Sequence, residues 1–254
     1  MILLAALTVA LSSLAAAADQ EAGTAKVSFT LDFPDSNPSH YEIIVNREGH
    51  GSYRSNGQLS QESEAVDPQT LEFTLSEKVR QEIFDLAKRA HYFSGKLDSG
   101  RKNLANTGAK TLRYDDGQRS SEATFNYSAL APVQQLTSIF QNLSTTLEFG
   151  RRLVFFHKYQ KLALEEDLRR MEELERTNGL GDLESIAPVL ENIAHDPAVM
   201  NVTRARALRL LATVHSGNRA GCDAPGSFWH KPSPLGHDDS CIAYNHFQVA
   251  GNLS

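Results

Sequence analysis

Residues 147–174 read LEFGRRLVFFHKYQKLALEEDLRRMEEL, and this stretch decides the fold. Its apolar residues recur every three or four positions, which predicts one long helix. In the second half they form a single stripe toward a core: Leu164, Leu168, Met171 and Leu174. In the first half a second set projects from the opposite side: Phe155, Tyr159 and Leu162. Because both faces need cover, we expect this helix to lie between a domain before it and helices after it.

Residues 26–144 predict a compact α+β domain. Apolar and polar residues alternate from Lys26 to Phe33, which is the period of a half-buried strand. Glu48-Gly49 and Asp116-Gly117 are turn signals between further strand-like segments. Strand pairs alternate with helices along the chain, so we expect an antiparallel sheet covered on one face by helices.

Helices are predicted before and after the central stretch. One follows Ser76, which stands at an N-cap position, and another opens at Pro132. Residues 145–216 predict a helical extension, in which the long helix is followed by a small helical bundle. Pro188 should kink its first helix or mark where that helix begins. The next helix should turn six apolar residues inward: Val199, Val202, Ala207, Leu210, Leu211 and Val214.

Composition excludes several classes of function. The chain of 254 residues is 41% hydrophobic, which suffices for a core of its own, and its net charge of −6 argues against a nucleic-acid surface. It contains no phosphate loop, no glycine-rich dinucleotide fingerprint and no Gly-x-Ser-x-Gly elbow. We therefore predict no cofactor, and the catalytic residues of any enzyme activity stay unknown.

The first 18 residues predict a signal peptide. They are almost entirely apolar and end in four alanines before Asp19, which fits a signal-peptidase site, although no Lys or Arg precedes the apolar run. No later stretch is apolar enough to span a membrane. We expect an exported protein, periplasmic or extracellular, with a mature chain that begins near Asp19.

Residues 217–254 form a tail of different composition, rich in Gly, Pro, Ser, His and Asp. It holds both cysteines, Cys222 and Cys241, and in an exported chain they predict one disulfide, which would contribute about 3 kcal/mol. The tail also carries four low-ranking candidates for metal ligands: His230, His237, Asp238 and His246. Their spacing matches no zinc motif, so a solvated polar tail is the simpler interpretation.

Charged residues dominate the second half of the long helix. Glu165 precedes Arg169 by four residues and Glu166 precedes Arg170 by four, so both pairs should support a solvated helix face. The apolar stripe of Leu164, Leu168 and Met171 has two interpretations. It is a seam for a partner protein or a second copy of this chain, or the later helices of the same chain cover it.

The order of elements resembles that of uncharacterised secreted bacterial proteins. The resemblance is carried by residues 41–45, YEIIV, by Gly49 to Tyr53, and by Phe73 to Phe84. The last two helices, with Asp196-Pro197 between them, resemble a single HEAT repeat. No activity is implied by either resemblance.

We therefore expect an exported envelope protein that acts as a non-enzymatic protein-interaction module. Its partner would be another envelope protein, with a homodimer as a further possibility. The alternative is a metal-assisted hydrolase that uses His230, His237 and Asp238 of the tail.

Overall fold

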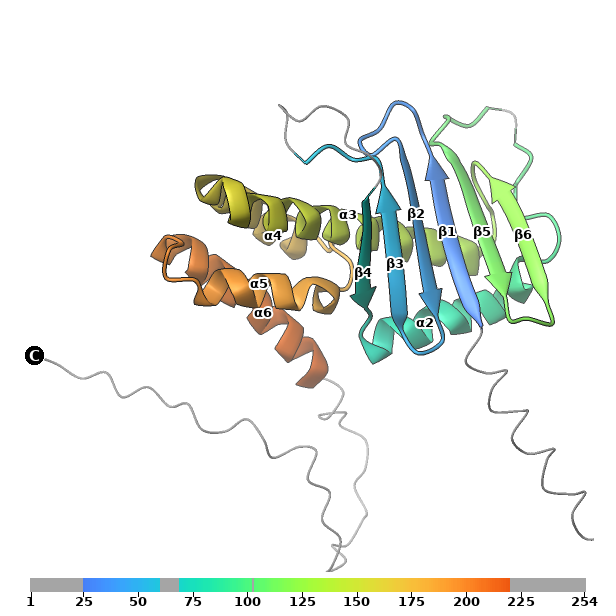
Figure 1. Cartoon of the computed structure of the whole chain (residues 1–254). Coiled ribbons are helices and arrows are strands. Elements are labelled where there is room, and N and C mark those ends of the chain that lie inside the picture. The colour runs from blue at the N-terminus through green and yellow to red at the C-terminus, as the bar shows by residue number, and fades with distance from the viewer. Residues whose placement is uncertain (1–24, 60–68, 102, 220–254) are drawn as a thin grey trace, which may run out of the picture.

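A computed structural model describes residues 25–59, 69–101 and 103–219 (Figure 1). One sheet contains six strands: β1 (Lys26–Asp32), β2 (His40–Asn46), β3 (His50–Ser55), β4 (Gln69–Thr74), β5 (Ala109–Asp115) and β6 (Ser120–Phe125). The α-helices are α2 (Glu77–Arg89), α3 (Ala131–Tyr159), α4 (Leu164–Arg176), α5 (Ala187–His195) and α6 (Asn201–Arg219). Short 3-10 helices are η1 (His91–Phe93), η2 (Lys161–Ala163) and η3 (Leu183–Ile186).

The sheet is antiparallel throughout, in the order β4-β3-β2-β1-β5-β6. Both predicted hairpins are present: the chain turns at Gly49 between β2 and β3, and at Gly117 between β5 and β6. Gly49 has a φ of +91°, a conformation that glycine adopts without strain. The predicted α+β class is therefore confirmed.

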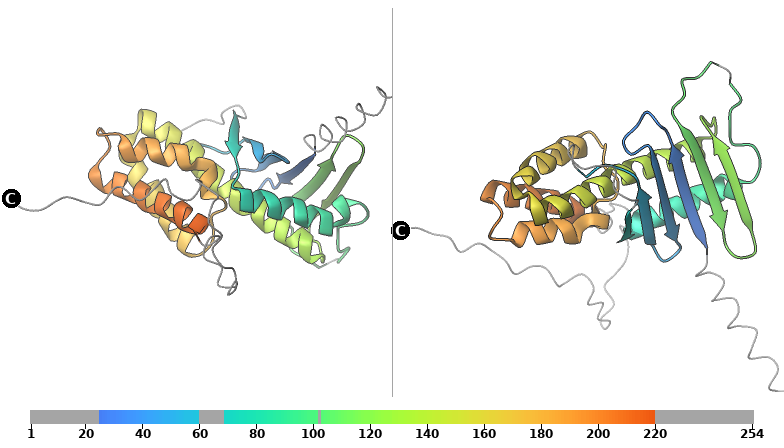
Figure 2. Two further views of the ribbon diagram at one scale, coloured as in Figure 1. Left: turned by 90° about the horizontal axis from the view of Figure 1, so that it is seen from below. Right: turned by 45° about the horizontal axis from the view of Figure 1, so that its top comes forward.

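Helices α2 and α3 cover one face of the sheet (Figure 2). Phe29 at the centre of β1 stacks on Phe140 of α3, with ring centroids 5.2 Å apart. Helix α2 begins after Ser76, whose hydroxyl accepts the Val79 N–H as predicted. The opposite face of the sheet carries polar side chains, among them Ser28, Thr30, Glu42, Arg54, Thr111 and Thr124. This alternation is what a sheet with one buried face requires.

The predicted long helix from Leu147 to Leu174 is wrong in its bounds. Helix α3 already begins at Ala131 and runs for 29 residues, so the predicted boundary between residues 144 and 145 falls inside it. It ends at Gln160, where φ of −144° and ψ of 60° leave the helical region. The same helix therefore covers the sheet with its first half and enters the helical bundle with its second.

After the break, α4 folds back antiparallel to α3. Near the break, Arg152 Nε donates to Asp167 Oδ2 at 2.9 Å, and at the far end Asn142 Nδ2 donates to the Asn178 carbonyl at 3.1 Å. This reversal turns the apolar stripe of α4 inward. Leu164, Leu168 and Met171 are completely buried inside the chain. They form no exposed partner surface, and of the two interpretations the intrachain cover is confirmed.

Two close contacts hold the bundle against α3. A Cβ on Gly150 would lie 2.6 Å from Ile186 Cγ2, and a Cβ on Gly181 would lie 2.5 Å from the backbone nitrogen of Leu143. Only glycine permits such an approach.

Helix α5 begins with Pro188 in its first turn, so this proline marks the start of the helix, one of the two predicted roles. In α6 the predicted inward residue Val202 is 50% exposed, because its neighbour Thr203 points inward instead, is completely buried and donates to Glu165 Oε2 of α4.

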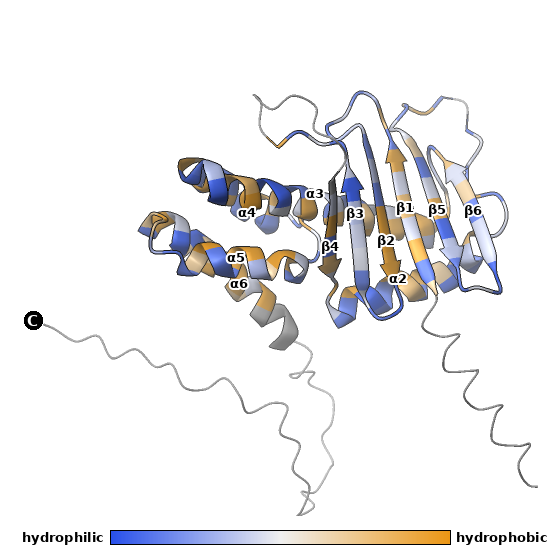
Figure 3. Cartoon of the chain, viewed as in Figure 1, coloured by the Kyte–Doolittle hydropathy of each residue, from blue (hydrophilic) through white to orange (hydrophobic). Residues whose placement is uncertain are grey.

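One hydrophobic cluster joins the sheet, α2, α3 and the bundle (Figure 3). It extends from Val27 of β1 to Leu211 of α6 as one cluster. The two halves are therefore packed as one body around α3.

Within the described residues, no helix combines the length and apolar character needed to cross a membrane.

Candidate functional site at the carboxyl end of helix α3

The end of α3 leaves one of its two apolar faces uncovered. Val154, Tyr159 and Leu162 are 51%, 62% and 77% exposed. The expectation that both faces find cover within the chain is wrong here, because α4 folds back over the other face. We call Val154, Lys158, Tyr159 and Leu162 the uncovered α3 face. Large apolar side chains gathered in this way are typical of binding surfaces.

Cations lie among these apolar side chains. Lys158 Nζ stands 5.0 Å from the ring centroid of Tyr159, in a cation–π contact. Lys161 Nζ lies 2.5 Å from Asp196 Oδ2, and His157 Nε2 lies 2.8 Å from the same oxygen. Lys161, the Ala198 N–H and His157 together hold the pKa of Asp196 far below its usual range. Asp196 therefore stays ionised and neutralises Lys161, whereas Lys158 rests on an aromatic ring.

A pocket of about 300 Å³ opens between β4 and this end of α3. We call it the α3 pocket. Its described lining is apolar and aromatic except for a threonine and two cations, and consists of Leu59, Thr70, Leu71, Arg151, Val154, Phe155, Lys158 and Tyr159. The Phe155 and Tyr159 rings, with centroids 5.2 Å apart and planes tilted by 49°, form one wall. Mostly apolar lining with a few polar groups is typical of small-molecule sites.

Behind the pocket lies a buried network centred on Glu148. Its Oε1 accepts hydrogen bonds from Tyr53 Oη at 2.7 Å, Ser55 Oγ at 2.5 Å and Arg151 Nη1 at 2.8 Å. Arg151 Nη1 also donates to Ser55 Oγ at 3.1 Å, and Ser144 Oγ lies 3.0 Å from Tyr53 Oη. Burial, assisted by the Glu148 charge, raises the pKa of Tyr53 well above its ordinary value. The phenol therefore stays protonated as a donor.

Arg151 links this network to the pocket. It is only 6% exposed, and its Nε is buried with no hydrogen-bond partner among the described residues. Sequence reasoning missed both Glu148 and Arg151. A signal existed, because the two charges stand three residues apart inside the apolar run from Leu147 to Leu153, where an unpaired charge could not be buried.

A hollow of about 700 Å³ lies where the two halves of the molecule join. Polar groups around it are engaged in closing the joint. The Ser76 N–H donates to Asp182 Oδ2 at 2.6 Å, and the Gly181 N–H donates to Thr146 Oγ1 at 2.8 Å. Burial raises the pKa of Asp182 despite the Ser76 N–H. This hollow serves packing, so we place the functional site at the α3 pocket instead.

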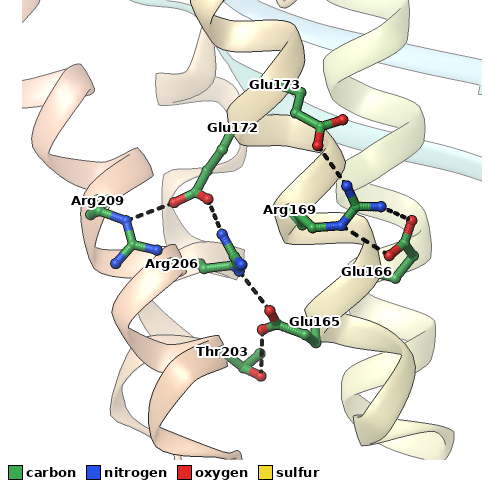
Figure 4. Close-up of polar contacts among 8 residues, drawn as sticks. All are labelled: Glu165, Glu166, Arg169, Glu172, Glu173, Thr203, Arg206 and Arg209. Atoms are coloured by element: carbon green, nitrogen blue, oxygen red, sulfur yellow. Dashed lines mark hydrogen bonds and ion pairs between the residues drawn. The ribbon is translucent and has the colours of Figure 1, made fainter.

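The charged face of α4 clamps α6 (Figure 4). Glu165 binds Arg206 Nε at 2.7 Å, and Glu172 binds both Arg206 and, at 2.7 Å, Arg209 Nε. The predicted Glu165–Arg169 pair is therefore wrong, since Glu165 turns toward α6. On this side of α4 the contacts replace the solvated face that the sequence predicts, whereas the outer side of the helix is exposed.

On the outer side of α4, Arg169 pairs with Glu166 at 2.5 Å and with Glu173 at 2.6 Å. Glu166 thus uses Arg169, three residues on, in place of the predicted Arg170.

The tail residues lie outside the described part of the chain. These are Cys222 and Cys241 of the predicted disulfide and the metal candidates His230, His237, Asp238 and His246. Between residues 25 and 219, as far as the structure describes them, no three His, Cys, Asp or Glu side chains gather as a metal site.

Comparison with known proteins adds no relative: no protein-family model matches the chain, and no curated protein matches it. The resemblance to secreted bacterial proteins stays a prediction, and any function rests on the geometry of the site.

Proposed function

We propose that this chain is an exported binding protein that holds a partner protein on the uncovered α3 face. The observation that carries the proposal is the exposure of Tyr159 at the end of α3 and of Leu162 in η2 just beyond it, 62% and 77%, whereas the other face of α3 is buried. Intrachain packing uses α4 and α5 on that other face. Burying the apolar side chains of the uncovered α3 face against a partner would remove them from water and so stabilise the complex.

The charges indicate the chemistry of the partner. Lys158 lies over Tyr159, and Lys161 and His157 share Asp196 at the edge of the same surface. The chain as a whole carries a net charge of −6, so this cationic region differs from the average of the molecule. A protein surface with an apolar centre and a carboxylate at its rim would match both the apolar side chains and Lys158.

Site-specific photo-crosslinking tests this proposal. A photoreactive amino acid would replace Leu162 in the full chain expressed in its own cells. The matched control places it at Leu104, another exposed leucine, which lies in the loop before β5. We expect one crosslinked protein from position 162 and none from position 104. The purified partner should then bind Leu162→Asp roughly tenfold more weakly than the unmodified chain.

Two outcomes would contradict the proposal. Equal crosslinking from both positions, or none from position 162, would show that the uncovered α3 face holds no partner. A product of twice the chain mass of 28.0 kDa would identify the occupant as a second copy of this chain.

A further inference from the structure

We propose that the α3 pocket binds a small organic acid with a flat apolar body. Its carboxylate would lie between Arg151 and Lys158, and its body would lie against Phe155, Tyr159 and Leu71. This inference goes beyond the protein-binding face, although Val154, Lys158 and Tyr159 belong to both that face and the pocket lining. Leu162, the most exposed residue of the face, lies outside the pocket lining, so crosslinking at position 162 and binding in the pocket are measured separately.

The balance of charge in the lining favours an anion. Among the described residues that line the pocket, Arg151 and Lys158 are cations and none is Asp or Glu. Glu148 balances Arg151, but it does not line the pocket, and its Oε1 is engaged by Tyr53 and Ser55 of the sheet. A ligand in the pocket thus meets the guanidinium and the ammonium groups without meeting the carboxylate.

Arg151 is an incompletely used donor. Its Nη1 is engaged by Glu148 at 2.8 Å and by Ser55 at 3.1 Å, and its Nε has no partner among the described residues. Buried donors without acceptors are rare in folded proteins. Carboxylate and guanidinium groups are both planar, so one carboxylate can accept hydrogen bonds from two N–H groups of the same arginine. An acid bound in the α3 pocket would add an acceptor beside a guanidinium whose hydrogen-bonding capacity the fold leaves incompletely used.

The size and walls of the pocket indicate the rest of the ligand. A volume of about 300 Å³ stands at the lower end of the range for small-molecule sites. The tilted rings of Phe155 and Tyr159 suit stacking or edge contacts with a planar body. Leu59 and Leu71 supply aliphatic walls, and the Thr70 hydroxyl is the remaining polar group. A single aromatic ring on a short chain fits these limits.

The neighbouring pocket is a poorer anion site. It lies on the other side of Val154 and Lys158, and it contains His157, Lys161 and Asp196. Asp196 already engages both Lys161 and His157, with contacts of 2.5 Å and 2.8 Å. An external carboxylate would have to compete with this internal one. In the α3 pocket Arg151 is paired with Glu148, but Lys158 has no carboxylate partner among the described residues, so this pocket offers the better balance of charge.

A pair of isosteric probes tests the proposal on the chain from Asp19 to Ser254. We would titrate 3-phenylpropionate and its neutral amide, 3-phenylpropionamide, by calorimetry and by ligand-observed NMR. We expect the acid to bind and the amide to bind at least roughly tenfold more weakly, because the amide lacks the charge that the two cations recognise. Equal binding of the two probes, or no binding of the acid at millimolar concentration, would overturn the proposal.

Matched variants locate the binding. Lys158→Gln removes a positive charge from the lining of the α3 pocket. Lys161→Gln also removes one positive charge, but from a residue that lines only the neighbouring pocket with His157 and Asp196. We expect Lys158→Gln to weaken the acid severalfold and Lys161→Gln to leave it unchanged. Arg151→Lys, checked for folding by circular dichroism, should also weaken it. Equal losses in Lys158→Gln and Lys161→Gln would show non-specific attraction and overturn the assignment. The crosslinking from position 162 stands or fails separately.

Discussion

At the scale of single residues, the Glu148–Arg151 pair is the most demanding feature of the chain. Both side chains are buried, so each needs the other to offset the loss of hydration. The pair also joins α3 to β3 through Ser55, which connects residues about 90 positions apart in the sequence. Breaking this buried pair should therefore lower the free energy of unfolding much more than breaking an exposed ion pair does.

We expect Glu148→Gln to lower the free energy of unfolding by about 3–5 kcal/mol, because it leaves the buried Arg151 charge without its counter-ion. Urea denaturation followed by circular dichroism measures this loss. Glu166→Gln is the matched control, since Glu166 pairs with Arg169 at the surface and should cost no more than about 1 kcal/mol. Similar losses in the two variants would show that the buried pair has no special role.

Asp182 gives a prediction for pH. Burial raises its pKa above the ordinary 3.8, so the folded chain holds this proton more tightly than the unfolded chain. Stability is therefore lost as the pH rises through the raised pKa. Asp182→Asn keeps an acceptor for the Ser76 N–H and removes this loss. We expect the variant to be more stable than the parent at pH 7 and to match it below pH 3.8, as measured by denaturation across pH.

At the scale of the elements, two leucines in and just before α4 differ widely in exposure. Leu168 is completely buried between α3 and the bundle, whereas Leu162 just before α4 is 77% exposed. We expect Leu168→Ala to cost about 2–5 kcal/mol through the cavity that it leaves, and Leu162→Ala to change stability by less than about 0.5 kcal/mol. Thermal and urea unfolding of both variants check this. A large loss in Leu162→Ala would mean that the α3 end is packed within the chain.

The clamp between α4 and α6 should respond to acid. Burial alone raises the pKa of Glu172, but Arg209 and Arg206 outweigh it and bring the pKa below the ordinary 4.5. The clamp is therefore fully stabilising above pH 4.5 and is lost as the pH falls below that value. We expect Glu172→Gln to cost about 1–3 kcal/mol at pH 7 and progressively less in acid.

Glu173→Gln provides the control for the clamp, because Glu173 is exposed and pairs only at the surface. Denaturation of both variants at pH 7 and in acid measures the difference. A cost of Glu172→Gln that stays constant with pH would contradict the ionic role.

The elements also show what local sequence can and cannot predict. Strands and hairpins follow from period-2 alternation and turn dipeptides, and Pro188 marks the start of α5 because proline fits a first helical turn. The end of α3 was missed because no proline or glycine stands at Gln160. That break is imposed by tertiary packing, which folds the Leu164 stripe back onto α3. Local pattern shows that a face is apolar, but not which part of the chain covers it.

The candidate site was harder to predict for the same reason. Five of the described lining residues lie on α3, from Arg151 to Tyr159, but the other three, Leu59, Thr70 and Leu71, stand about 80 or more residues earlier. Only the pairing of β3 with β4 and the packing of α3 on the sheet bring these segments together. The tail cysteines and histidines stood out by composition alone, and they lie outside the described residues.

At the scale of the whole molecule, the continuous core predicts cooperative unfolding. Apolar contacts pass from the sheet through α3 into α4, α5 and α6 as one cluster. We expect a single transition in urea, with the same midpoint by circular dichroism and by hydrogen exchange of β1 and of α6. Leu168→Ala should move both midpoints together. Separate transitions for the sheet and the bundle would contradict the shared core.

The length of α3 also fixes a distance. At 1.5 Å per residue, its 29 residues extend for about 44 Å from Ala131 beneath the sheet to Tyr159 at the uncovered end. No loop interrupts this span, and its buried residues extend from Val133 near one end to Phe156 near the other. A partner bound at Tyr159 would therefore stand at a distance from the sheet that the helix itself sets.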